Sequence, residues 1–159
     1  MEKLTKQDVL ELVYTNYYNG GKNGWDNSKS TCVYFAKETS GNCAVGVLLK
    51  HLGLNVEDLV GQFGNHNSGA TVLGLLGNCE NIKKIFSERL EEDVYENLKD
   101  GSFLTRLQKA HDRPAQDAHR FALSEEESRT NLLYSLRRFA TDSYICLDTM
   151  TENLAKNSQ

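Results

Sequence analysis

The stretch from residue 40 to residue 49, SGNCAVGVLL, constrains the fold more than any other part of this 159-residue chain. Ser40 and Asn42 are residue types that often cap helices, and the apolar run after them has helical length. The pattern predicts a core helix whose first turn contains Cys43. Because free N–H groups at a helix N-terminus favour a thiolate, Cys43 is either a packed small residue or a nucleophile.

Composition narrows the class of protein. With 39% hydrophobic residues and a net charge of −4, the chain fits one compact domain over residues 1–159. The acidic balance disfavours general binding of nucleic acid. No apolar stretch approaches the ~20 residues that a membrane span needs, and no signal peptide precedes the first helix. We therefore expect a cytoplasmic protein with reduced thiols.

Helical periodicity dominates the chain, beginning with a helix over about residues 6–18. Residues 31–36 form the best candidate strand because they are β-branched and aromatic. Residues 70–76 are apolar and fit a helix or a strand equally. The pattern predicts an α+β fold, mostly α-helical, in which one short strand pair packs on about six helices.

The C-terminal half is expected to be entirely helical apart from its connections. Pro114 predicts the end of the helix that Ser102 caps, followed by a polar loop to about residue 122. Ser124 begins another helix, and apolar spacing from residue 147 to residue 154 suggests a last one. The chain is expected to fray after about residue 155.

The first candidate site combines Cys43 with His111 and Asp112. A cysteine nucleophile needs an imidazole base within hydrogen-bond reach and a group that orients the imidazole. Adjacent side chains on one helix diverge by about 100°, so we do not expect Asp112 to orient His111 directly. Asp112 is expected to cap a turn or to bind Arg113. The alternative is that His111 complements the C-terminal dipole of its helix while Cys43 packs in the core.

The cysteines allow two further arrangements, a metal site and a disulfide. Cys32, Cys43, His111 and Asp112 offer zinc ligands, but no C-x-x-C pair is present and the spacing lacks knuckle geometry. We therefore expect no metal and no other cofactor. A Cys32–Cys43 disulfide would require oxidation.

The polar loop Asn65-His66-Asn67 is a weaker candidate site. Its amides and imidazole ring can contact a small polar ligand. The same residue types also form local turn hydrogen bonds, which is the interpretation we favour.

Three motifs occur in order: Cys32-Val33-Tyr34, then Gly41 to Leu48 with the sequence GNCAVGVL, then Leu107 to Asp112 with the sequence LQKAHD. This layout resembles a loose family of small uncharacterised bacteriophage and prophage proteins, over about residues 32–147. Their pattern is C-x-Y, a glycine-containing turn, C-A-[IV]-G-x-L and L-Q-x-x-H-D. This chain lacks the second cysteine often found after Val47 and the tryptophan often found after Asp112.

The resemblance implies a phage setting but no established activity. The favoured interpretation is an accessory protein that binds and inhibits a host defence nuclease or effector. A nucleotide signal and an identical subunit are other candidate partners, whereas nucleic acid and membranes are not expected. The alternative is a cysteine hydrolase or transferase that uses Cys43, His111 and Asp112.

Overall fold

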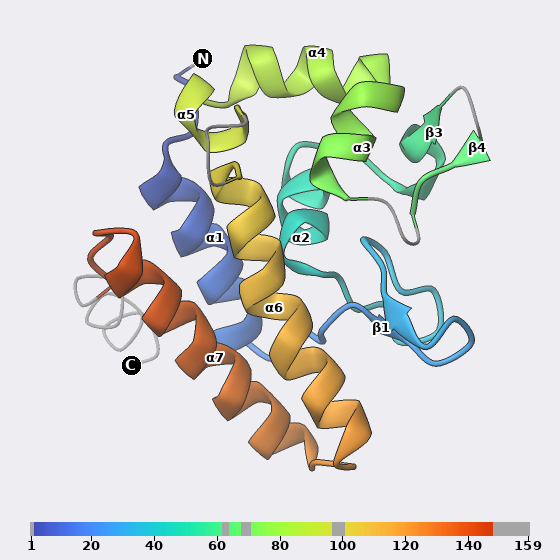
Figure 1. Ribbon diagram of the computed structural model, residues 1–159, viewed down its shortest axis with the longest axis vertical. Helices are drawn as coiled ribbons and strands as arrows, with labels where there is room; N and C mark the ends of the chain where they lie inside the picture. Colours follow the sequence, from blue (N-terminus) through green and yellow to red (C-terminus); the bar gives the residue numbers. More distant parts are fainter. Residues whose placement is uncertain (1, 62–63, 68–70, 97–100, 148–159) are drawn as a thin grey trace.

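The computed structural model describes residues 2–61, 64–67, 71–96 and 101–147, and seven α-helices account for most of them (Figure 1). The helices are α1 (Lys6–Tyr18), α2 (Ala44–His51), α3 (Val72–Asn78), α4 (Glu80–Arg89), α5 (Glu92–Tyr95), α6 (Phe103–Arg120) and α7 (Glu125–Asp142). A 3₁₀ turn, η1 (Val56–Leu59), follows α2. The mostly helical α+β prediction is confirmed.

Short antiparallel strand pairs connect the helices. Strand β1 (Trp25–Asp26) pairs with β2 (Thr31–Cys32), and β3 (Val60–Gly61) pairs with β4 (Gly64–Asn65). The strand expected over residues 31–36 is therefore only two residues long before an isolated bridge joins Phe35 to Asn42. The N–H groups of Val33, Tyr34 and Ala36 bond instead to three separate segments, at the carbonyls of Gly24, Asn67 and Gly41.

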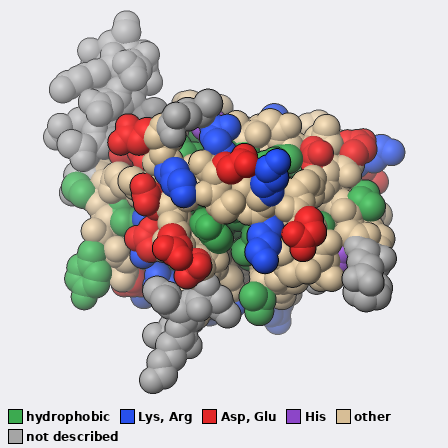
Figure 2. All heavy atoms as spheres, turned by 90° about the horizontal axis from the view of Figure 1, so that it is seen from above, with side chains coloured by type: hydrophobic (Ala, Val, Ile, Leu, Met, Phe, Trp, Pro, Cys, Tyr) green, Lys and Arg blue, Asp and Glu red, His purple; other side chains and the backbone are tan. Residues whose placement is uncertain are grey.

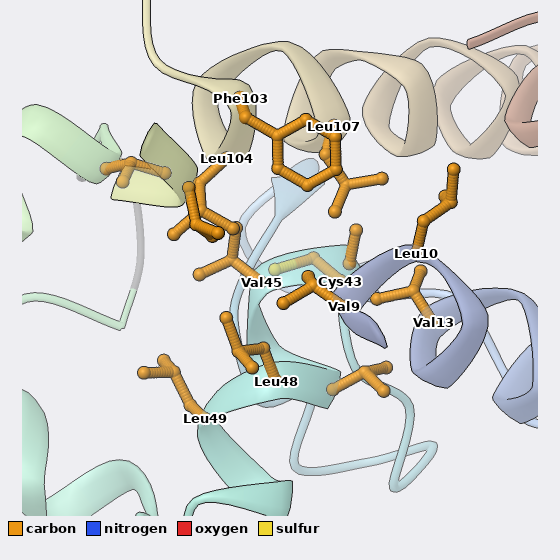
Figure 3. Close-up of a cluster of buried hydrophobic side chains, with 14 of the residues drawn as sticks. Val9, Leu10, Val13, Cys43, Val45, Leu48, Leu49, Phe103, Leu104 and Leu107 are labelled. Carbon is orange, nitrogen blue, oxygen red and sulfur yellow. The ribbon is translucent and has the colours of Figure 1, made fainter. Parts of the chain in front are cut away.

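The long helices α1, α6 and α7 lie side by side, and α2 packs against α1 and α6 (Figure 1). One cluster of buried apolar side chains draws on every α-helix. Figure 3 shows part of this cluster, where side chains of α1, α2 and α6 meet around Cys43. The amphipathic spacing read from the sequence thus gives each helix its buried face.

Helix starts agree closely with the sequence. The predicted helix over 6–18 coincides with α1, and Thr5 and Asp8 form a reciprocal capping box. Ser124 and Glu127 form another at the start of α7. The region around 70–76, which fitted helix or strand, contains the start of α3, capped by Thr71. The expected last helix and the frayed tail after 155 lie outside the described residues, apart from Leu147.

The prediction that Pro114 ends its helix is wrong, because α6 continues to Arg120. Proline has no N–H, so the carbonyl of Ala110 loses its usual helical partner. The hydroxyl of Ser135 on α7 donates to this carbonyl at 2.6 Å. A side chain from the neighbouring helix therefore satisfies the group that proline leaves unpaired.

The surface carries charges of both signs. Figure 2 shows Lys and Arg side chains intermingled with Asp and Glu on the face at the α4 end of the molecule. Within the described residues, no helix combines the length and apolar character required to cross a bilayer.

Candidate functional site

Cys43 caps helix α2 from inside the core. Its Sγ accepts a hydrogen bond from the N–H of Gly46 at 3.3 Å, so the thiol itself is the N-cap and lies before the first turn rather than within it. The residue is 1% exposed. Figure 3 shows its sulfur among labelled apolar side chains that include Val9 and Val45.

Burial dominates the electrostatics of this thiol. It raises the pKa of Cys43 to about 12; the N–H of Gly46 opposes the rise and the charge of Asp112 adds to it. Burial likewise raises the pKa of Cys32, with the Asp112 carboxylate as the next cause. Both thiols are therefore protonated at neutral pH.

His111 lies in the middle of α6 and is fully buried. Its Nδ1 is 2.8 Å from Oδ1 of Asp112, and its Nε2 accepts the N–H of Gly24 at 3.2 Å. The ring also stacks on Tyr17, with 5.6 Å between ring centroids. The prediction that His111 complements the C-terminal dipole of its helix is therefore wrong, because α6 extends past Pro114 and His111 is not at its end.

The prediction that Asp112 cannot orient His111 is also wrong. The 100° divergence describes the directions of the Cβ atoms, whereas the hydrogen bond joins atoms two bonds beyond Cβ, whose positions depend on two torsion angles in each side chain. Oδ1 of Asp112 additionally accepts the side-chain amide of Gln108 at 2.6 Å. Asp112 therefore belongs to a network within α6, and no ion pair joins it to Arg113 among the described residues.

These hydrogen bonds assign the tautomer of His111. Nε2 must present a lone pair to the Gly24 N–H, so the ring proton sits on Nδ1 and is donated to Asp112. Both ring nitrogens are thereby engaged. In this arrangement neither nitrogen is available to accept a proton from Cys43.

A group of metal-ligating side chains lies beside this network. Ligand atoms of Cys32, His111 and Asp112 lie within 4.8 Å of one another, whereas Cys43 is not part of the group. A metal on Nδ1 would require the ring proton to move to Nε2, where the Gly24 N–H already points. The donor set therefore does not fit a metal ion without rearrangement of the loop at Gly24.

The loop residues predicted as a weak ligand site make turn and anchoring contacts. The side chain of Asn67 makes two hydrogen bonds to the backbone of Phe35. Its Oδ1 accepts the Phe35 N–H at 2.8 Å and its Nδ2 donates to the Phe35 carbonyl at 2.9 Å. Asn65 donates to the carbonyl of Val56. His66 is half-buried, and its Nε2 has no hydrogen-bond partner among the residues that the structure describes.

Sequence reasoning missed Gln108 and Gly24. Gln108 links two elements, because its Oε1 accepts the Val45 N–H at the start of α2 while its Nε2 donates to Asp112. Its position three residues before His111, within the LQKAHD motif, was the available signal. For Gly24 no local signal existed, because its N–H meets a residue 87 positions later.

No family model, curated protein or solved structure matches this chain.

Proposed function

We propose that this protein acts by binding a partner, with Cys43 and His111 as interior residues and not as a catalytic dyad. The hydrogen bonding of His111 carries this proposal. Its Nδ1 donates to Asp112 and its Nε2 accepts from Gly24, so the general-base position that a cysteine enzyme needs is filled. The buried thiol with a pKa of about 12 supports the same conclusion.

The proposed partner follows from the resemblance to small phage proteins. It is a host protein in the bacterial cytoplasm, such as a defence nuclease or effector, which this chain would inhibit. A nucleotide signal is the second candidate, and self-association remains compatible with either. The mixed charges on the face in Figure 2 suit a protein partner better than a nucleic-acid backbone.

Iodoacetamide labelling of the native protein across pH, read at each cysteine by mass spectrometry, tests the interior role of Cys43. Cys146 is exposed and serves as the internal control. We expect Cys146 to label readily and Cys43 to label only after denaturation. If Cys43 labels faster than Cys146 near neutral pH, and His111→Ala slows it, the cysteine enzyme is the better account.

A cellular assay tests the binding function itself. The chain is expressed in bacteria that carry single, defined defence nucleases or effectors, and the plating efficiency of a restricted phage is measured. We expect restored plating with the wild type and with Cys43→Ala, provided the variant is folded. Loss of rescue by a folded Cys43→Ala protein would contradict the proposal, because only catalysis requires that thiol.

A further inference from the structure

A pocket of about 250 Å³ adjoins the Cys43–His111 centre, and it is lined by side chains from β2, α3 and α6. The residues that matter for its chemistry are Cys32, Tyr34, Gln108, Lys109 and Asp112. The volume is that of a single side chain or a small planar group.

The Asp112 carboxylate is the fixed charge of this pocket. Oδ1 accepts hydrogen bonds from His111 at 2.8 Å and from Gln108 at 2.6 Å. The Cys32 thiol lies beside the same carboxylate, no further hydrogen bond to Oδ2 comes from the residues that the structure describes, and the Asp112 side chain is 42% exposed. One oxygen is therefore anchored while the carboxylate keeps an open acceptor beside the pocket.

The anchoring groups are themselves held rigidly. His111 is fully buried and bonded to Gly24, and Gln108 is bonded to the N–H of Val45. Immobilising a carboxylate in this way removes the entropy that it would otherwise lose on binding. A pre-organised carboxylate beside a pocket is suited to a cationic group that donates several hydrogen bonds.

We propose that this pocket binds a guanidinium group, carried by an arginine side chain of the protein partner. Guanidinium is planar, has five N–H donors and is weakly hydrated, so it enters a partly apolar pocket more readily than an ammonium group does. An inserted arginine is also a common energetic centre of protein interfaces. That the guanidinium belongs to a protein partner rests on the proposed function. That the pocket takes a guanidinium at all rests on Asp112.

Lys109 is the one cationic side chain that lines the pocket, and it makes no ion pair among the described residues. It is exposed and also lines the neighbouring groove between α6 and α7, so its ammonium group has room in solvent. Its charge should weaken guanidinium binding modestly. Removing it is therefore expected to strengthen binding, the opposite of removing the charge of Asp112.

Amide chemical-shift titration of the isotope-labelled full chain tests the proposal, with N-acetyl-arginine amide as the probe. N-acetyl-citrulline amide is the control, because it keeps the shape of arginine without the charge. We expect saturable shifts at residues 32–34 and 108–112, and binding at least tenfold weaker for the citrulline compound, which corresponds to about 1.4 kcal/mol.

Variants give each residue its own expected result. Asp112→Asn should weaken binding of the arginine compound at least tenfold, and Lys109→Ala should strengthen it about twofold or more. Asp117→Asn, on the same helix but in the groove between α6 and α7, should leave it unchanged. If Asp112→Asn does not fold, the comparison with citrulline and Lys109→Ala decides the question.

Equal binding of the arginine and citrulline compounds, or shifts confined to another face, would overturn the guanidinium site. If free guanidinium ion and an arginine-containing tripeptide bind with equal affinity, the inference that a protein partner supplies the guanidinium is wrong. Protection of Cys43 together with no arginine binding would refute this inference and leave the proposed function standing. Rapid labelling of Cys43 with intact arginine binding would overturn the binding function and the partner as carrier, while supporting the guanidinium site.

Discussion

The Pro114–Ser135 contact offers a quantitative test of how α6 stays continuous. The Ser135 hydroxyl donates at 2.6 Å to the Ala110 carbonyl, which Pro114 cannot serve. A net hydrogen bond contributes about 1 kcal/mol, and a partly buried carbonyl left unpaired costs a similar amount or more. Ser135→Ala should therefore lower the free energy of unfolding by about 1–1.5 kcal/mol.

A second substitution isolates the reason for this loss. In a Pro114→Ala background, the N–H of the new alanine can bond the Ala110 carbonyl in the ordinary helical way. Ser135→Ala should then cost less than about 0.5 kcal/mol, which gives a coupling energy near 1 kcal/mol between the two positions. Pro114→Ala alone should stabilise the protein, because proline is unfavourable in a helix interior.

Urea unfolding of the four proteins, followed by far-UV circular dichroism, measures this coupling. Ser128→Ala on the same helix is the matched control: Ser128 is half-buried and its hydroxyl makes no hydrogen bond among the described residues. We expect the control to change stability by less than about 0.5 kcal/mol. An equal cost of Ser135→Ala in both backgrounds would show that the hydroxyl does not compensate for the proline.

Three further predictions concern the region around Cys43. Burial raises the pKa of Cys43 from 9.0 to about 12, so its contribution to stability is complete below pH 9. Between about pH 9 and 12 the free energy of unfolding should fall by up to ~1.4 kcal/mol per pH unit, because only the unfolded chain ionises this thiol there. Urea unfolding at alkaline pH should show a smaller fall in the Cys43→Ala protein. Gly46→Ala should cost about 3 kcal/mol in thermal unfolding because the new Cβ would collide with the Tyr34 carbonyl, whereas Gly77→Ala, with open space around it, should be neutral or stabilising. Asn67→Ala should cost about 2 kcal/mol in the same assay by removing both bonds to Phe35, whereas Asn81→Ala, which removes one exposed bond, should cost less than about 0.5 kcal/mol.

Local chemistry made most of the helices predictable. Capping residues such as Thr5 and Ser124 act within three residues along the chain, so their effect is readable from the sequence. The amphipathic spacing that follows them is equally local. The ambiguity over residues 70–76 has the same origin, because a short apolar run carries no period that separates helix from strand.

The end of α6 was predicted wrongly because its cause is non-local. The rule that proline ends a helix assumes that the carbonyl four residues earlier finds no other partner. Here the partner is Ser135, which lies 25 residues beyond Ala110 and on another helix. No pattern around Pro114 identifies such a compensating group.

The residue types of the candidate site were predictable, but the hydrogen-bond partners of those residues were not. His111 and Asp112 were identified as a pair of interest, yet the ring nitrogen that decides between catalysis and packing bonds to Gly24, 87 residues away. The sequence can place an imidazole and a thiol in one protein. It cannot state which lone pairs remain free once the backbone has closed around them.

The glycines around Cys43 have a packing role in the SGNCAVG motif and in the loop that faces it. A Cβ at Gly24 would meet the backbone of Cys43 and Val33, and a Cβ at Gly46 would meet the carbonyl of Tyr34. The start of α2 is thus a place where backbone segments pass too closely for any side chain, and a buried thiol is small enough to cap the helix there. The pairing of glycines with cysteine in SGNCAVG therefore has a sufficient cause in packing. Cys43 is buried there, whereas the carboxylate of Asp112 is half-exposed, so Asp112 is the more accessible of the two groups.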